Sequence, residues 1–145
     1  AIGMELEVTD AAEVRLHRAV VAADTGQVVD PDGLAAQLEG GVLQAASWTL
    51  YEEVRFDTEK VTSRDWRTHP TLRHTDTPAR IDVVFVNGDP NPNRPDLPHY
   101  GAGEAACKPT IAAVANAIYD ATGVRIRRIP FRDERVLVAL KAAGV

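Results

Sequence analysis

The segment that begins at Asp30 constrains the fold most, because it carries both a helix-start signal and a long helical repeat. Asp30 can accept a hydrogen bond from the first helical turn, and Pro31 has the fixed backbone angle that suits the first helical position. Apolar residues then recur at helical spacing as far as position 51. They are Leu34, Leu38, Val42, Ala45, Ala46 and Leu50. We therefore expect a mostly buried helix against which the rest of the chain packs.

Alternating or continuous runs of apolar residues on both sides of this helix are typical of strands. Residues 4–8 and 13–23 predict an opening hairpin. Residues 81–86 are rich in branched side chains, and they predict a strand in the interior of the sheet. A second, more exposed hairpin is expected within residues 51–63, and a short strand at residues 124–129.

Two further helices and a proline-rich loop complete the chain. Helices are predicted at residues 109–122, where Gly123 is a stop signal, and at residues 133–143. Residues 87–98 hold four of the nine prolines, so neither a helix nor a strand ladder can persist there. The sequence thus predicts an α+β fold in which a mixed sheet with β-hairpins packs against two to three helices, in a single domain spanning residues 1–145.

Composition excludes several classes of function. A net charge of −5 argues against the broad positive field that a nucleic-acid partner needs. No apolar run approaches the roughly 20 residues of a transmembrane helix. Cys107 is the only cysteine and the four histidines are scattered, so we expect no metal ligated by protein side chains and no iron–sulfur cluster on this chain. The compartment stays open between cytoplasm and periplasm.

Two adjacent glycines, Gly40 and Gly41, lie inside the first predicted helix. Each costs about 1 kcal/mol relative to alanine in a helix interior, so a close approach should compensate. One interpretation is tight packing against another element of the fold. In the other, Gln37 or Gln44 presents its amide, which is both donor and acceptor, to a heterocyclic ligand.

A second motif, Gly101-Ala102-Gly103-Glu104, ends the proline-rich loop just before a helix. Glycines let a backbone approach a ligand, and a carboxylate beside small apolar residues suits a general base. Alternatively, Glu104 only complements the positive end of the following helix. Dinucleotide binding is disfavoured, because no apolar strand runs directly into the motif. For Cys107, a buried packing role is favoured over a reactive thiol.

Four ordered segments together resemble one family. Residues 24–33, 37–41, 101–106 and 115–125 are similar to the molybdopterin-binding (large) subunits of molybdenum hydroxylases, the family of xanthine dehydrogenase, aldehyde oxidase and isoquinoline 1-oxidoreductase. The resemblance covers nearly the whole chain, and the segments occur in the family's order. It implies that the chain forms the C-terminal portion of a molybdopterin-binding domain.

The resemblance also implies an activity and a set of site residues. Enzymes of this family are molybdenum-dependent oxidoreductases that hydroxylate an aldehyde or an N-heteroaromatic carbon with oxygen from water. Glu104 matches the family's general base, which deprotonates the metal-bound hydroxide or water. The residues that match the cofactor-binding segments are Gln37, Gly40, Gly41, Ala102 and Gly103. Because the pterin dithiolene holds the molybdenum, no protein metal ligand is expected.

The implied cofactor is molybdenum–molybdopterin, and the sequence leaves open whether the pterin carries a cytosine dinucleotide. Family subunits are longer than this chain, so the cofactor is expected to be shared with the remainder of the molybdopterin-binding subunit. Electrons are expected to pass to 2Fe-2S clusters on a partner subunit or domain. The alternative is a noncatalytic fragment or interaction module that keeps the fold without the cofactor.

Overall fold

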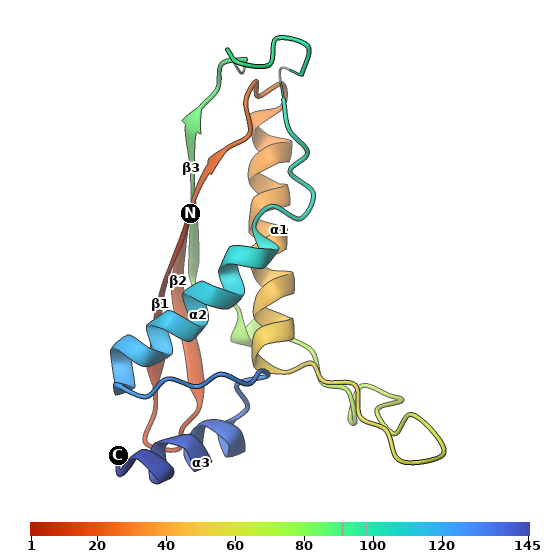
Figure 1. The fold of residues 1–145 in the computed structure, drawn as a ribbon, viewed down its shortest axis with the longest axis vertical. Coiled ribbons are helices and arrows are strands. Elements are labelled where there is room, and N and C mark those ends of the chain that lie inside the picture. Colours follow the sequence, from red (N-terminus) through yellow and green to blue (C-terminus); the bar gives the residue numbers. More distant parts are fainter. Residues whose placement is uncertain (91, 98) are drawn as a thin grey trace.

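The computed structural model of the chain describes residues 1–90, 92–97 and 99–145. Its sheet has three strands in the order β1-β2-β3, with β1 antiparallel to β2 and β3 parallel to β2. The predicted α+β fold with a mixed sheet is confirmed (Figure 1). In chain order the elements are β1 (Ile2–Val8), β2 (Val14–Asp24), α1 (Pro31–Leu50), the 3-10 turn η1 (His74–Asp76), β3 (Arg80–Asn87), α2 (Cys107–Thr122) and α3 (Asp133–Ala143).

The helix α1 begins and runs as its sequence predicts. The Asp30 carboxylate accepts a hydrogen bond from the backbone N–H of Gly33 at 3.0 Å, and Pro31 occupies the first turn. Over its 20 residues α1 buries one face, which includes Leu38, Val42 and most of the last two turns. The capping signal and the periodicity therefore agree, and together they place this helix against the sheet.

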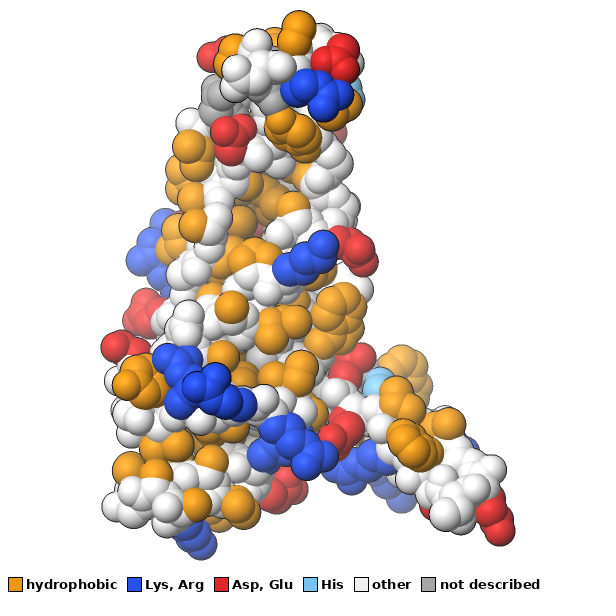
Figure 2. All heavy atoms as spheres, in the orientation of Figure 1, with side chains coloured by type: hydrophobic (Ala, Val, Ile, Leu, Met, Phe, Trp, Pro, Cys, Tyr) orange, Lys and Arg blue, Asp and Glu red, His pale blue; other side chains and the backbone are white. Residues whose placement is uncertain are grey.

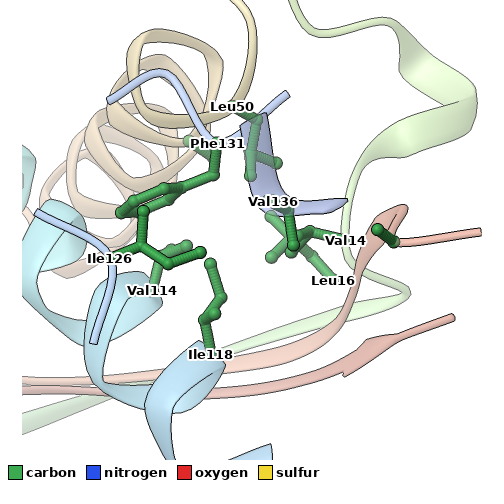
Figure 3. Packing of buried hydrophobic residues seen from close by; sticks show 10 residues of the cluster. Val14, Leu16, Leu50, Val114, Ile118, Ile126, Phe131 and Val136 are labelled. Carbon is green, nitrogen blue, oxygen red and sulfur yellow. The ribbon is translucent and has the colours of Figure 1, made fainter. Parts of the chain in front are cut away.

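Helices α1 and α2 cover the same face of the sheet, and α3 closes its lower end (Figure 1). The largest buried cluster joins strand β2, the three helices and the segment that precedes α3 (Figure 3). Its labelled members are Val14, Leu16, Leu50, Val114, Ile118, Ile126, Phe131 and Val136. A second cluster joins β2, α1 and the start of α2, so the two helices are fixed relative to each other by the sheet beneath them.

The strand β3 lies at an edge of the sheet, so the predicted interior position is wrong. Its partner β2 already pairs with β1 on the other side. Only one face of β3 packs inward, through Ile81, Val83 and Phe85, while Val84 is 49% exposed. The abundance of branched residues correctly indicated a strand with a buried face. It could not indicate whether the strand pairs with one neighbouring strand or with two.

Two predicted β elements do not form. Within residues 51–63 the predicted hairpin is reduced to an isolated bridge between Phe56 and Val61, beside which the N–H of Thr62 donates to the carbonyl of Arg55 at 2.7 Å. Residues 124–129 contain no strand. Ile126 instead joins the main core.

Tyr51, the residue at which α1 ends, allows the first test of this packing. Burial, reinforced by Asp76 and other nearby carboxylates, raises the pKa of Tyr51 to about 12. A tyrosine in the unfolded chain ionises near pH 10, so the stability from this raised pKa is fully present below about pH 10 and is lost as the pH rises through about 12. In an absorbance titration of tyrosinate, we expect one of the three tyrosines to ionise late, and Tyr51→Phe to remove that late step. A late step that survives in the Phe variant would show that Tyr51 is more solvated.

Candidate active site

The glycine motif lies in a turn that leads directly into α2. Residues 103–106 are turns in the backbone, and the N–H of Cys107 donates to the carbonyl of Glu104 at 3.1 Å. Ala106 is the helix cap and contributes no side-chain hydrogen bond. The side chain of Glu104 is therefore held at the start of a helix, and within this chain it is exposed.

The two predicted cofactor segments meet at one hydrogen bond. The side-chain amide of Gln37, on α1, donates to the backbone carbonyl of Gly103 at 2.8 Å. These residues are 66 positions apart in the sequence. The contact fixes the residue that precedes Glu104 against the exposed side of α1, so both motifs belong to one surface.

The two adjacent glycines of α1 have different surroundings. A Cβ atom on Gly41 would lie 3.1 Å from the Cβ of Ala106 and 3.6 Å from the sulfur of Cys107, whereas a Cβ on Gly40 meets nothing within 4 Å. Gly41 thus lets the start of α2 approach α1 closely. Gly40 is exposed, and its backbone stays accessible to a ligand or to another part of the protein. Packing therefore explains one glycine, and the other remains open to the ligand interpretation.

The loop that carries the motif is tethered upstream as well. The N–H of Tyr100 donates to the carbonyl of Thr25 at 2.9 Å, and Gly26 forms an isolated bridge with His99. A hollow of about 320 Å³ lies between this tether and the start of α1, and a second of about 190 Å³ is lined in part by Leu38 and Ala106. Thr25 has no signature of this role in the sequence, because it contributes only a backbone carbonyl.

Cys107 behaves as the packing residue that the sequence favoured. Burial raises the pKa of its thiol, and the negative charge of Glu104 adds to the rise. The free thiol is buried beside Gly41. A protonated, enclosed thiol is a poor nucleophile, so Cys107 belongs to the helix contact and not to the chemistry of the site.

The surface at Glu104 combines side-chain amides, open backbone and a carboxylate, and the exposed Lys108 follows Glu104 four residues later. Gln37, Gly40 and Gln44 are exposed along α1, Gly103 is exposed and Ala102 is half-buried beside them. Among the described residues, no group of three or more His, Cys, Asp or Glu side chains could hold a metal ion. In the same part of the chain no helix has the length and hydropathy to cross a bilayer.

Comparison with known proteins decides the family. The profile described as the molybdopterin cofactor-binding domain matches residues 1–78, which is more than half of the chain. The chain belongs to this family. A nicotinate dehydrogenase subunit from Pseudomonas putida is 41% identical over 132 residues, which are 91% of this chain and 10% of that protein. The region matched by the profile contains Gln37, Gly40 and Gly41.

Solved structures contain the same fold. Quinoline 2-oxidoreductase from Pseudomonas putida superposes with a TM-score of 0.81 at 26% identity, over 91% of this chain and 17% of that chain. The aldehyde oxidoreductase from Desulfovibrio gigas superposes with a TM-score of 0.78 at 32% identity, over 92% of this chain and 14% of that chain. This chain therefore spans less than a fifth of the length of each of these relatives.

Proposed function

We propose that this chain supplies the general base and part of the cofactor surface of a molybdenum hydroxylase. The observation that carries the proposal is the hydrogen bond from Gln37 to the carbonyl of Gly103, which brings the family's two motifs onto one surface. The names of the relatives, which include a nicotinate dehydrogenase and an aldehyde oxidoreductase, support an aldehyde or N-heteroaromatic substrate.

The exposed residues fit a pterin-held metal. Gly40 leaves the backbone of α1 open, so a flat ring can approach it closely. Side-chain amides such as those of Gln37 and Gln44 offer both donors and acceptors to the heteroatoms of a pterin. Molybdenum needs no His or Cys cluster if the cofactor carries its own sulfur ligands. We infer that Gln37, Gly40, Ala102 and Gly103 line the molybdenum–molybdopterin cofactor.

Glu104 has the chemistry of the base in this reaction. When bound, the molybdenum–pterin group supplies the two-electron oxidation. The Glu104 carboxylate would accept the proton of the water that provides the product's oxygen, and the hydrogen bond from Gln37 to the carbonyl of Gly103 would keep the turn that carries Glu104 beside α1. Gly41 is a positioning residue. Because it has no side chain, Ala106 can pack closely against α1, and this packing sets the distance between α1 and the turn that carries Glu104.

The remaining parts of the reaction need partners. With a single cysteine the chain cannot ligate a 2Fe-2S cluster, so we propose that electrons leave to clusters on an iron–sulfur subunit or domain. The exposure of Glu104 and of Gly40 within this chain is consistent with a cofactor that is enclosed only when the remainder of the molybdopterin-binding subunit is present.

Elemental analysis tests this proposal. We expect molybdenum in the chain purified with the remainder of the subunit and the iron–sulfur partner. We expect none in the chain purified alone, because this chain forms only one side of the proposed cofactor site. Nucleotide analysis of the released cofactor tests the cytosine dinucleotide form. Molybdenum in neither preparation would overturn the proposal and favour the noncatalytic fragment.

A further inference from the structure

Residues 52–78, here called the arm, leave the body of the molecule after α1 and return at β3. Figures 1 and 2 show this segment projecting away from the sheet and helices. Its only regular structure is the 3-10 turn η1 and the bridge between Phe56 and Val61. Loops of this length without regular structure are uncommon in compact domains, and ordered ones usually have a binding role.

The arm is anchored at its base. The carboxylate of Glu53 pairs with Arg135 of α3 at 3.0 Å, and this hydrogen bond lowers the pKa of Glu53. On the returning side, the N–H of Leu72 donates to the hydroxyl of Ser47 at 2.9 Å. Both connections hold the arm to the body, so its direction relative to the sheet is fixed.

The outer part of the arm is held in shape by two aspartates. Asp57 accepts hydrogen bonds from the N–H groups of Glu59 and Lys60 at 2.8 and 2.9 Å. Asp65 accepts one from the N–H of Thr68 at 2.9 Å. These backbone hydrogen bonds lower the pKa of both aspartates. A segment whose turns are already formed loses little conformational entropy when it binds.

The shaped arm directs apolar side chains into solvent. Trp66 is 82% exposed, Phe56 76%, Val54 62% and Val61 47%. Trp66 also borders a hollow of about 380 Å³ that it shares with His69 and neighbouring residues. A covered Phe or Trp buries about 150–250 Å², so the two aromatic side chains alone would supply about 300–500 Å² of the roughly 800 Å² per partner of a standard interface.

We propose that the arm is the docking element by which this chain binds the remainder of the molybdopterin-binding subunit. The inference rests on the proposed function for the existence of that partner. The family match extends through residue 78 and so contains the whole arm, and the solved relatives devote more than four-fifths of their chains to other regions. The six acidic and five basic residues of the arm nearly cancel in charge, so the contact is expected to depend on its exposed apolar side chains and not on a strongly charged partner.

Hydrogen exchange tests the docking directly. We expect the amides of residues 54–66 to exchange at least about tenfold more slowly in the assembled enzyme than in the chain alone. Equal rates in the two preparations would overturn the inference. So would protection in the chain alone that rises with its concentration, because that result would identify a second copy as the occupant. An enzyme that holds molybdenum but leaves the arm unprotected would refute the docking role and leave the proposed function intact.

Two matched variants distinguish a loss of arm docking from the general effect of removing an exposed valine. Val54→Ser on the arm and Val138→Ser on α3 remove the same side chain at 62% and 68% exposure. We expect the arm variant to lower the yield of assembled enzyme severalfold and Phe56→Ser/Trp66→Ser to lower it at least about tenfold, because aromatic anchors dominate interfaces. The α3 variant should match the parent chain. Equal losses in both valine variants, or no loss in the double variant, would contradict the proposal.

Discussion

Glu104→Gln is expected to lower the turnover of the assembled enzyme by about 10²- to 10⁴-fold, which is the usual contribution of a general base. The amide has the size of the carboxylate but cannot accept the proton of the attacking water. Because the side chain is exposed in this chain, the free energy of unfolding should change by less than about 0.5 kcal/mol. Steady-state kinetics measures the turnover, chemical denaturation measures the free energy of unfolding, and elemental analysis shows whether the variant retains molybdenum.

Glu5→Gln is the matched control for this experiment. Glu5 is an exposed glutamate on β1, outside the Glu104 turn, and the same substitution there should leave turnover unchanged. Near-parental turnover of Glu104→Gln in a molybdenum-loaded enzyme would reject Glu104 as the base. Loss of molybdenum together with turnover would instead assign Glu104 a role in retaining the cofactor.

Gly41→Val is expected to destabilise the chain by about 1–3 kcal/mol, the usual effect of overpacking, because its first side-chain atom would already lie 3.1 Å from Ala106. The added bulk must move the start of α2, and Glu104 would move with it. Molybdenum content and turnover of the assembled enzyme should therefore fall together with the denaturation midpoint of the chain.

Gly40→Val provides the contrast one residue away. The space beside Gly40 is open, and valine has a higher helix propensity than glycine, so stability should be unchanged or slightly higher. If α1 faces the pterin there, the branched side chain should still lower molybdenum content. Normal molybdenum content in this variant would show that the cofactor does not approach α1 at Gly40, and unchanged stability of Gly41→Val would show a looser helix contact.

The sequence by itself determined the elements whose signals are local. The start of α1 depends on Asp30 and Gly33, which are only three positions apart, so the signal for it lies within the local sequence. The end of α2 depends on Gly123, whose φ of 72° is the left-handed value that glycine adopts without strain. For that reason both ends were predicted at the residues where the structure has them, Pro31 and Thr122.

Strand neighbours were decided by the tertiary structure. The alternation in β3 shows which face is buried, but it carries no information about whether a second strand lies beyond it. The parallel pairing of β3 with β2 joins Val20 to Asp82, and α1 and the arm lie between them in sequence. For the same reason residues 124–129, which alternate like a strand, pack into the core without one.

At the candidate site, too, the sequence identified the individual motifs and the tertiary structure decided which of them meet. The sequence singled out Gln37 and the Gly103–Glu104 turn as separate motifs, and only the fold brings the amide of Gln37 to the carbonyl of Gly103. Gly40 and Gly41 are indistinguishable in the sequence. Successive residues of an α-helix point about 100° apart, so once α2 packs against α1 one glycine lies in the contact and the other in the open.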